Sequence, residues 1–369
     1  MHHLFRLVVL AALFVANACT PRPALPGPAA GKAPTGYPKN VILLIGDGMG
    51  LGQITGGMFA SEQPLNLERF KHIGLHKPYS SDNLITDSAA GATAFSAGIK
   101  TYNGAIGVDP KGAPVETILE MAEKRNLATG MVATSTIVHA TPASFIAHQP
   151  QRKMYEEIAA DFLRTDIDYF VGGGKKFFTN REDGRDLLAE LRTKGYTVGD
   201  FFGGRMQAFK PDPAKNYAYI TSENDPLPVL NGRDYLLPAT QLGLDFLPRR
   251  SEKGFFYMIE GSQIDWGGHS NNSEYIISEV QDFDKAVGAA LDFAEKDGET
   301  LVIVTADHET GGYAINYGSR RDSIIGVFTS DYHTATLIPV FAYGPGSEQF
   351  TGIYENTAIF DKLKILLRF

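Results

Sequence analysis

Five short runs of apolar residues, rich in β-branched side chains, constrain the fold of this chain more than any other feature. They are residues 41–45 (VILLI), 129–134, 255–259, 301–306 and 338–344. Runs without polar alternation are typical of strands buried on both faces. Segments with the apolar spacing of helices, residues 115–125 and 274–296, lie between them. The sequence therefore predicts an α/β fold with a largely parallel central sheet covered by helices on both faces.

The segment 172–248 has a different composition from the rest of this predicted domain. It is richer in glycine, proline and charge, and it contains no long apolar run. We expect an irregular insertion or cap outside the sheet core, within a single domain that spans residues 37–369.

The first 36 residues indicate export. Arg6 precedes an apolar run over residues 7–16, which is too short to span a bilayer comfortably. Small residues then lead to Cys19, a pattern that resembles a bacterial lipoprotein signal with residues 1–18 removed and Cys19 lipidated. The alternative is an ordinary signal-peptidase site with an incidental cysteine. Residues 20–36 contain five prolines and predict a Pro-rich tether. We expect an exported protein, either periplasmic or an outer-membrane lipoprotein anchored to the membrane at Cys19.

Charge and cysteine content exclude several classes of protein. The chain has 34 Lys and Arg against 42 Asp and Glu, a formal charge of -8, and no basic block. A nucleic-acid scaffold role is therefore not expected. Cys19 is the single cysteine, which excludes an intramolecular disulfide framework and a multi-thiolate metal cluster. Any bound metal needs His, carboxylate or hydroxyl ligands.

Polar side chains with metal-binding chemistry follow three of the apolar runs. They are Asp47, Glu260, Asp265, His269, Asp307 and His308. Each one alone could be a turn former or a helix cap. Because the carboxyl ends of parallel strands meet at one sheet edge, several carboxylates there would repel one another unless cations neutralised them. Mixed imidazole and oxygen donors suit zinc, and oxygen donors alone suit magnesium.

Ser88 is the candidate nucleophile. Small residues follow it over 89–94, so a helix can begin there, and a helix N-terminus favours an anion. The alternative is a serine that only caps this helix. No GxSxG elbow surrounds Ser88, so activation by a metal is favoured over activation by a histidine.

Six sequence blocks follow one another along the chain: residues 46–50 (GDGMG), 86–109, 139–148 followed by Arg152, 260–269, 305–312 and 333–334. Together and in this order they resemble the alkaline phosphatase family of the metal-dependent, serine-nucleophile type. The resemblance covers about residue 37 to the C-terminus and is weakest over 172–248. It implies hydrolysis of phosphate monoesters through a phosphoserine on Ser88.

The resemblance also implies which residues bind metal. One zinc would be held by Asp265, His269 and His333, a second by Asp47, Asp307 and His308, and a magnesium by Asp47, Thr141 and Glu260. Arg152 would grip the phosphate with its planar fork. Without the family context, Arg152 would be interpreted as an exposed helix residue.

Two positions depart from the best-known enterobacterial pattern of this family. His139 stands where that pattern has Asp, near the magnesium, and Trp266 stands where it has Lys, near the phosphate. Animal and some marine bacterial members also have His at the first position. We expect a magnesium site that is exchangeable or partly occupied, and phosphate that is released more readily.

Other functions stay open at this point. A phosphodiesterase or a sulfatase could share the fold, although Thr141 and Glu260 favour the monoesterase. A surface lipoprotein that binds metal or phosphate without turnover would not need Ser88. Because relatives are commonly homodimers, a homodimer is one assembly open to the chain, but no segment stands out as the crown that some relatives use at their interface.

Overall fold

The computed structural model describes residues 36–369 of the chain. The predicted signal peptide over 1–18, the predicted lipid site at Cys19 and residues 20–35 of the predicted tether lie outside the described residues. Within residues 36–369, no helix combines the length and apolar character needed to cross a membrane.

In the described part of the chain, ten strands form one sheet in the order β14-β2-β13-β8-β1-β7-β3-β4-β6-β5. Their bounds are β1 Asn40–Gly46, β2 His72–Lys77, β3 Ala128–Thr136, β4 Tyr169–Gly173, β5 Thr197–Asp200, β6 Tyr217–Ile220, β7 Phe255–Gly261, β8 Thr300–Thr305, β13 Ile338–Tyr343 and β14 Gly352–Glu355. Strand β13 runs antiparallel to both of its neighbours, and the other pairs in this sheet are parallel. The prediction of a largely parallel α/β sheet is confirmed.

The central strand β1 explains why the apolar runs show no polar alternation. It pairs in parallel with β7 on one side and β8 on the other, and all of its residues are buried. Val41, Leu43 and Ile45 enter one core cluster, whereas Ile42 and Leu44 enter another. Because successive side chains of a strand point to opposite faces, both faces of the sheet must be covered.

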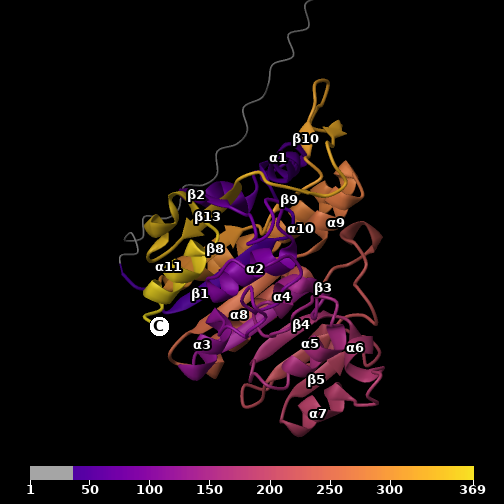
Figure 1. Cartoon of the computed structure of the whole chain (residues 1–369), viewed down its shortest axis with the longest axis vertical. Coiled ribbons are helices and arrows are strands. Elements are labelled where there is room, and N and C mark those ends of the chain that lie inside the picture. The colour runs from indigo at the N-terminus through magenta and orange to yellow at the C-terminus, as the bar shows by residue number, and fades with distance from the viewer. Residues whose placement is uncertain (1–35) are drawn as a thin grey trace, which may run out of the picture.

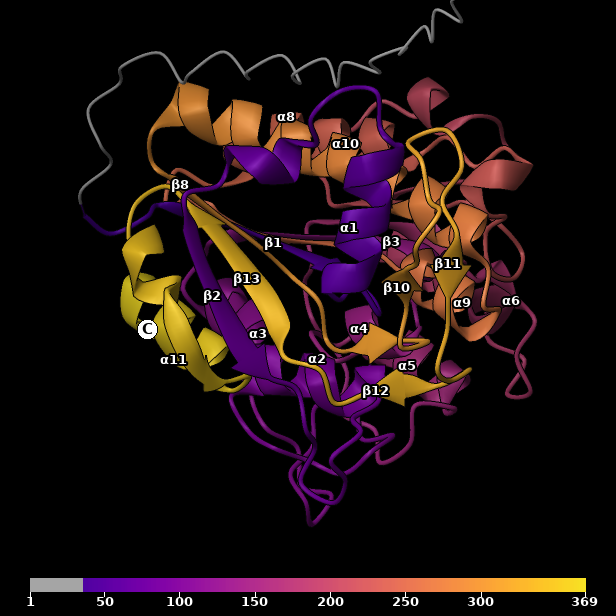
Figure 2. The same cartoon turned by 90° about the horizontal axis from the view of Figure 1, so that it is seen from above.

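Helices form the two outer layers (Figure 2). Helices α1 (Leu51–Ala60), α8 (Leu236–Arg250) and α10 (Ser273–Asp297) contribute to one core cluster. The other cluster draws on α2 (Ser88–Ala97), α3 (Ile118–Lys124), α4 (Ala140–Ala143), α5 (Tyr155–Asp161), α6 (Lys175–Thr179), α7 (Leu187–Thr193) and α11 (Ala358–Leu366). The predicted helices over 115–125 and 274–296 correspond to α3 and α10. Helix α3 begins at Ile118 because Thr117 and Glu120 form a capping box at its start.

The expectation that segment 172–248 lies outside the sheet is wrong. Strands β6 and β5 from this segment continue the sheet beyond β4, at the end far from α11 (Figure 1). Both strands have only four residues. Strand β6 (YAYI) is buried, and two of its residues, Tyr217 and Tyr219, are tyrosines. Short strands rich in tyrosine do not produce the long aliphatic runs that marked the central strands.

Smaller elements complete the chain around this sheet. Two short antiparallel pairs lie outside it, β9 (Glu309–Thr310) with β12 (His333–Thr334), and β10 (Ala314–Ile315) with β11 (Gly326–Val327). Helix α9 (Gln263–His269) follows β7 directly. The short 3-10 turns are η1 Asn66–Arg69, η2 Met206–Ala208, η3 Val229–Asn231 and η4 Ser347–Phe350. Elements α9, β9 and β12 come after the carboxyl ends of β7 and β8, where the candidate site lies.

Candidate active site

The carboxyl ends of β1, β7 and β8 bring three carboxylates to one place. Asp47, Glu260 and Asp307 are all fully buried. The strands are in register here, with Ile45 opposite Glu260 of β7 and also opposite Thr305 of β8. The backbone nitrogen of Gly48 donates to Asp307 Oδ1 at 3.2 Å, which ties the loop after β1 to the end of β8.

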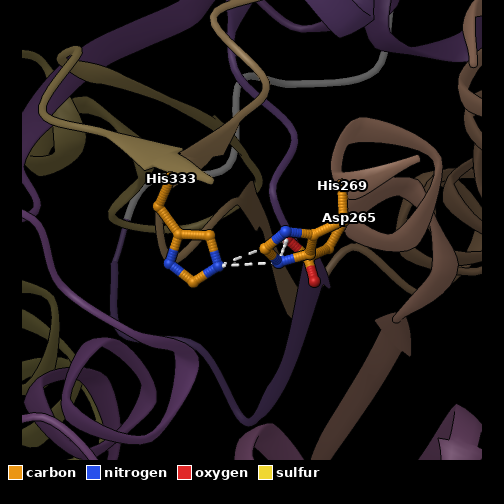
Figure 3. A group of neighbouring side chains, drawn as sticks. All are labelled: Asp265, His269 and His333. Atoms are coloured by element: carbon orange, nitrogen blue, oxygen red, sulfur yellow. Dashed lines mark hydrogen bonds and ion pairs between the residues drawn. The ribbon is translucent and has the colours of Figure 1, made fainter. Parts of the chain in front are cut away.

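Asp265, His269 and His333 form the first candidate metal group (Figure 3). Asp265 and His269 lie one turn apart on α9, and β12 brings His333 to face them. His269 Nε2 lies 3.2 Å from His333 Nε2, and these nitrogens lie 3.4 and 3.5 Å from Asp265 Oδ1. The Nδ1 atoms of the two histidines lie 2.7 and 2.8 Å from the carbonyl oxygens of Asp331 and Thr86. Because a carbonyl only accepts, each Nδ1 donates and each Nε2 keeps a free lone pair.

A second group and a third group share Asp47. Asp47, Asp307 and His308 form the second, and His308 Nε2 lies 3.3 Å from Asp307 Oδ2 and 3.5 Å from Asp47 Oδ1. Asp47, His139 and Glu260 have ligand atoms within 4.8 Å of one another and form the third. The imidazole rings of His308 and His333 stack with centroids 3.5 Å apart, so the first and second groups are adjacent.

Several oxygen atoms of the buried carboxylates in these groups lack a hydrogen-bond donor. Within residues 36–369, both carboxylate oxygens of Asp47, Oε1 of Glu260 and Oδ2 of Asp307 have no hydrogen-bond partner. Burial, reinforced by the charges of Asp307 and Asp265, raises the pKa of Asp47 well above its ordinary value. Burial likewise raises the pKa of Glu260 to about 8. Buried carboxylates without donors are stabilised by cations, so the residues present fit bound metal ions.

Ser88 is the first residue of α2 and lies beside the second group. Its Oγ is 3.3 Å from His308 Nε2, and the residue is 2% exposed. The N-cap of α2 is Asp87, whose side chain accepts from the backbone nitrogen of Ala90 at 3.0 Å. The alternative in which Ser88 is the cap is therefore wrong, and its hydroxyl is available at the N-terminus of the helix.

Arg152 lies in the loop that precedes α5, and not on a helix. Its Nη1 donates to Asp87 Oδ2 at 3.0 Å, and its Nη2 lies 3.4 Å from His139 Nε2. The guanidinium is therefore held at the N-terminus of α2 by Asp87, the residue that caps this helix.

His139 belongs to the third group, and Trp266 lies beside it. Their rings meet edge-on, with centroids 6.1 Å apart, and both residues are half-buried. Burial and the positive charge of Arg152 lower the pKa of His139 to about 3, so its imidazole is neutral at ordinary pH. Thr141 lies nearby on α4 and is fully buried. Every residue singled out from the sequence for catalysis, phosphate binding or metal binding is thus found at this one edge of the sheet.

Two further residues of the site, Asp87 and Thr310, were not singled out from the sequence. Asp87 directly precedes the candidate nucleophile, and an aspartate at that position is a usual N-cap, so its capping role could have been inferred. Thr310 contacts Asp265 and His308 through its hydroxyl. No local pattern marks it, because Asp265 belongs to a different element.

A parallel α/β sheet with acidic and imidazole groups around a serine at a helix N-terminus is the arrangement of a metal-dependent hydrolase. The model of the alkaline phosphatase family matches residues 38–327. Alkaline phosphatase 3 of Bacillus subtilis is 39% identical over 320 residues, which cover 82% of this chain and 67% of that protein. The alkaline phosphatase of Escherichia coli is 32% identical over 411 residues, covering 89% of this chain and 86% of that protein.

Solved structures agree with these sequence comparisons. The alkaline phosphatase of the Antarctic bacterium TAB5 superimposes with a TM-score of 0.86 at 47% identity, and the match covers 91% of this chain and 99% of that one. A His-to-Asp variant of that enzyme is described with magnesium bound in its M3 site. This chain belongs to the alkaline phosphatase family. It is a metal-dependent hydrolase of phosphate monoesters.

Proposed function

We propose that Ser88 is the nucleophile and Arg152 the phosphate-binding side chain when this chain hydrolyses phosphate monoesters. The observation that carries the assignment is the position of Ser88 Oγ, which lies 3.3 Å from His308 Nε2 of the second group. Arg152 approaches the same helix N-terminus through Asp87. A nucleophile, an anion-binding helix end and a guanidinium are therefore next to one another.

We propose zinc in the first and second groups. In a tetrahedral zinc site with bonds of about 2.0–2.1 Å, neighbouring ligand atoms lie about 3.3 Å apart. The ligand atoms of Asp265, His269 and His333 lie 3.2 to 3.5 Å apart. The distances from His308 to Asp47 and Asp307 fall in the same range. Each group would hold a zinc ion through three protein ligands, and the zinc would then be open to a substrate oxygen or water.

The third group suits magnesium, with Asp47, Glu260 and Thr141 as oxygen ligands. His139 offers a nitrogen at the same place. Imidazole is a poorer ligand than carboxylate for magnesium, so we propose a weakly held, exchangeable magnesium ion here. In the TAB5 relative, a variant with aspartate in place of a histidine is described with magnesium bound in its M3 site.

The reaction proceeds in two displacements on phosphorus. Ser88 Oγ loses its proton and forms a bond to phosphorus while the ester P–O bond breaks, which releases the alcohol and leaves a phosphoserine. Water then forms a new P–O bond as the Oγ–P bond breaks, which releases inorganic phosphate and restores the serine hydroxyl. When bound, the metal ions supply Lewis acidity that lowers the pKa of oxygen nucleophiles and stabilises leaving oxygens. Arg152 and the α2 N-terminus stabilise negative charge on the phosphoryl oxygens in both steps.

The test is an activity assay after reconstitution with zinc and magnesium, with an aryl phosphate and its methyl diester compared in parallel. We expect the monoester to be hydrolysed far faster than the diester, and chelation to abolish the activity. Faster turnover of the diester would assign the site to a phosphodiesterase. Tight binding of phosphate without turnover of either ester would make the chain a receptor.

We also propose that the mature protein is an exported lipoprotein attached to a membrane through Cys19. The support is the short apolar run and the small residues that precede this single cysteine. Metabolic labelling with palmitate in a bacterial host should label the full chain and leave a Cys19→Ala variant unlabelled. Absence of label in the parent chain, together with release of a soluble protein, would favour the ordinary signal-peptidase site.

A further inference from the structure

Thr310 lies at the boundary between the first and second metal groups. It is fully buried in β9, where it is the cross-strand partner of His333. Its Oγ1 lies 2.5 Å from Asp265 Oδ1, a member of the first group, and 3.2 Å from His308 Nδ1, a member of the second. Thr310 therefore contacts both groups through its hydroxyl and also lies opposite His333 across the strand pair.

The hydroxyl of Thr310 has a single proton, and its surroundings decide where that proton points. An ionised carboxylate can only accept, so Thr310 donates to Asp265. The same oxygen must then accept from His308, which places a proton on His308 Nδ1. His308 Nε2 consequently carries the free lone pair, and this atom lies 3.3 Å from Asp307 Oδ2 and from Ser88 Oγ.

The packing around Thr310 leaves its side chain little freedom. A Cβ on Gly48 would lie 2.6 Å from Thr310 Oγ1, and a Cβ on Gly268 would lie 2.8 Å from both Cβ and Cγ2 of Thr310. Gly48 adopts φ +69, a left-handed conformation that favours glycine. The carbonyl oxygen of Thr310 also accepts from Gln53 Nε2 at 2.6 Å. The loop after β1, helix α9 and helix α1 together fix the position of the hydroxyl.

We infer that Thr310 is a positioning residue that prepares both metal groups at once, by orienting the Asp265 carboxylate and by selecting the Nδ1-protonated tautomer of His308. The inference rests on the proposed metal-dependent function. Histidines that bind metal are held in this way by a partner on the opposite ring nitrogen, and loss of such a partner lowers metal affinity by about 10- to 100-fold. In this chain the hydroxyl of Thr310 is the partner of His308 in the second group, and the same hydroxyl orients the Asp265 carboxylate of the first group.

The first experiment measures zinc affinity by titration of the metal-free protein with zinc, in competition with a chromogenic chelator. We expect Thr310→Val, which keeps the shape but removes the hydroxyl, to weaken zinc binding by about 10- to 100-fold. Thr310→Ser, which keeps the hydroxyl, should bind zinc as the parent chain does. Equal zinc affinity in the parent and valine proteins, or a serine variant as weak as valine, would overturn the inference.

Thr305→Val is the matched control. Thr305 is also fully buried and lies on β8. Within residues 36–369, its Oγ1 donates to the carbonyl oxygens of Pro339 at 3.0 Å and of Ala306 at 3.4 Å, and neither residue belongs to a metal group. This variant should lose a comparable buried hydrogen bond and keep its zinc affinity. A loss of zinc affinity as large as that of Thr310→Val would show that any buried hydroxyl has this effect, and it would overturn the inference.

A second measurement is made on the parent protein, and a variant serves only to assign a signal. Long-range ¹H–¹⁵N spectra of the metal-free parent protein distinguish histidine tautomers, and His308→Gln identifies the signal of His308. We expect His308 to carry its proton on Nδ1, and a proton on Nε2 would overturn the inference. If the reconstituted parent binds zinc but hydrolyses no monoester, the proposed function fails while the tautomer still decides the role of Thr310.

Discussion

Trp266 directly follows the candidate zinc ligand Asp265 and lies half-buried beside His139. It brings no charge to a site that must bind and then release a phosphate dianion. We expect Trp266→Lys to strengthen inhibition by inorganic phosphate by about tenfold, the effect of one hydrogen bond between charged groups. Slower product release should then lower kcat. The measurement is the inhibition constant of inorganic phosphate for the reconstituted enzyme.

Trp266→Gln is the control for this prediction, because it removes the indole without adding a charge. It should leave phosphate inhibition close to that of the parent. If the lysine variant shows unchanged inhibition, or if glutamine strengthens inhibition as much as lysine, the charge at this position does not govern phosphate release.

Helix α2 depends on Asp87 at its N-terminus, since this side chain accepts from the Ala90 backbone nitrogen. We expect Asp87→Ala to lower the free energy of unfolding by about 1 kcal/mol through loss of the cap. Asparagine is an equally good cap, so Asp87→Asn should lie within a few tenths of a kcal/mol of the parent. Urea unfolding of the metal-loaded proteins measures both. Equal destabilisation by alanine and asparagine would show that the negative charge of Asp87, which pairs with Arg152, contributes more to stability than the capping hydrogen bond.

The central strands could be predicted from the sequence because burial on both faces of the sheet requires apolar residues along their length. Residues 41–45 must be apolar throughout, since β1 is covered on both faces. Strands β5 and β6 could not be predicted, because they are four residues long and β6 relies on tyrosine. Tyrosine has both apolar and polar atoms, so the residue type alone does not indicate whether Tyr217 and Tyr219 are buried. Their burial is seen only once β6 pairs with β4 in the structure.

The residues of the candidate site that directly follow a strand, or that belong to a recognisable sequence block, could be predicted from the sequence. Asp47, Asp307 and His308 come directly after β1 and β8, and parallel strands deliver such residues to one edge. The role of Thr310 could not be predicted in the same way. Its hydroxyl meets Asp265, 45 positions away, through the packing of β9 against α9.

The molecule as a whole places several carboxylates at one sheet edge, so its stability should depend on metal and pH together. In the metal-free protein, burial raises the pKa of Glu260 from an ordinary 4.5 to about 8. Between these values the folded protein holds a proton that the unfolded chain has lost. The free energy of unfolding therefore falls as pH rises through this window, by about 1.4 kcal/mol per pH unit for each such carboxyl. The pKa of Asp47 and that of Asp307 are raised in the same direction.

Urea unfolding between pH 7 and 8 tests this prediction, because buried histidines such as His139 are then mostly neutral in both states. We expect the chelated protein to lose stability across this range. The metal-loaded protein should not show this loss, since its ligand carboxylates are ionised and bound to cations. Parallel stability curves with and without metal would contradict the assignment of these carboxylates to metal sites.

The central claim is that Ser88 carries the phosphoryl group during hydrolysis, and acid quenching of the working enzyme tests it most directly. The zinc- and magnesium-loaded protein is mixed with a ³²P-labelled phosphate monoester and quenched, and the labelled peptide is identified by mass spectrometry. The account predicts phosphate on Ser88, and no phosphoprotein in Ser88→Ala although that variant still binds zinc. Full turnover by Ser88→Ala, or label on a different residue, would contradict it.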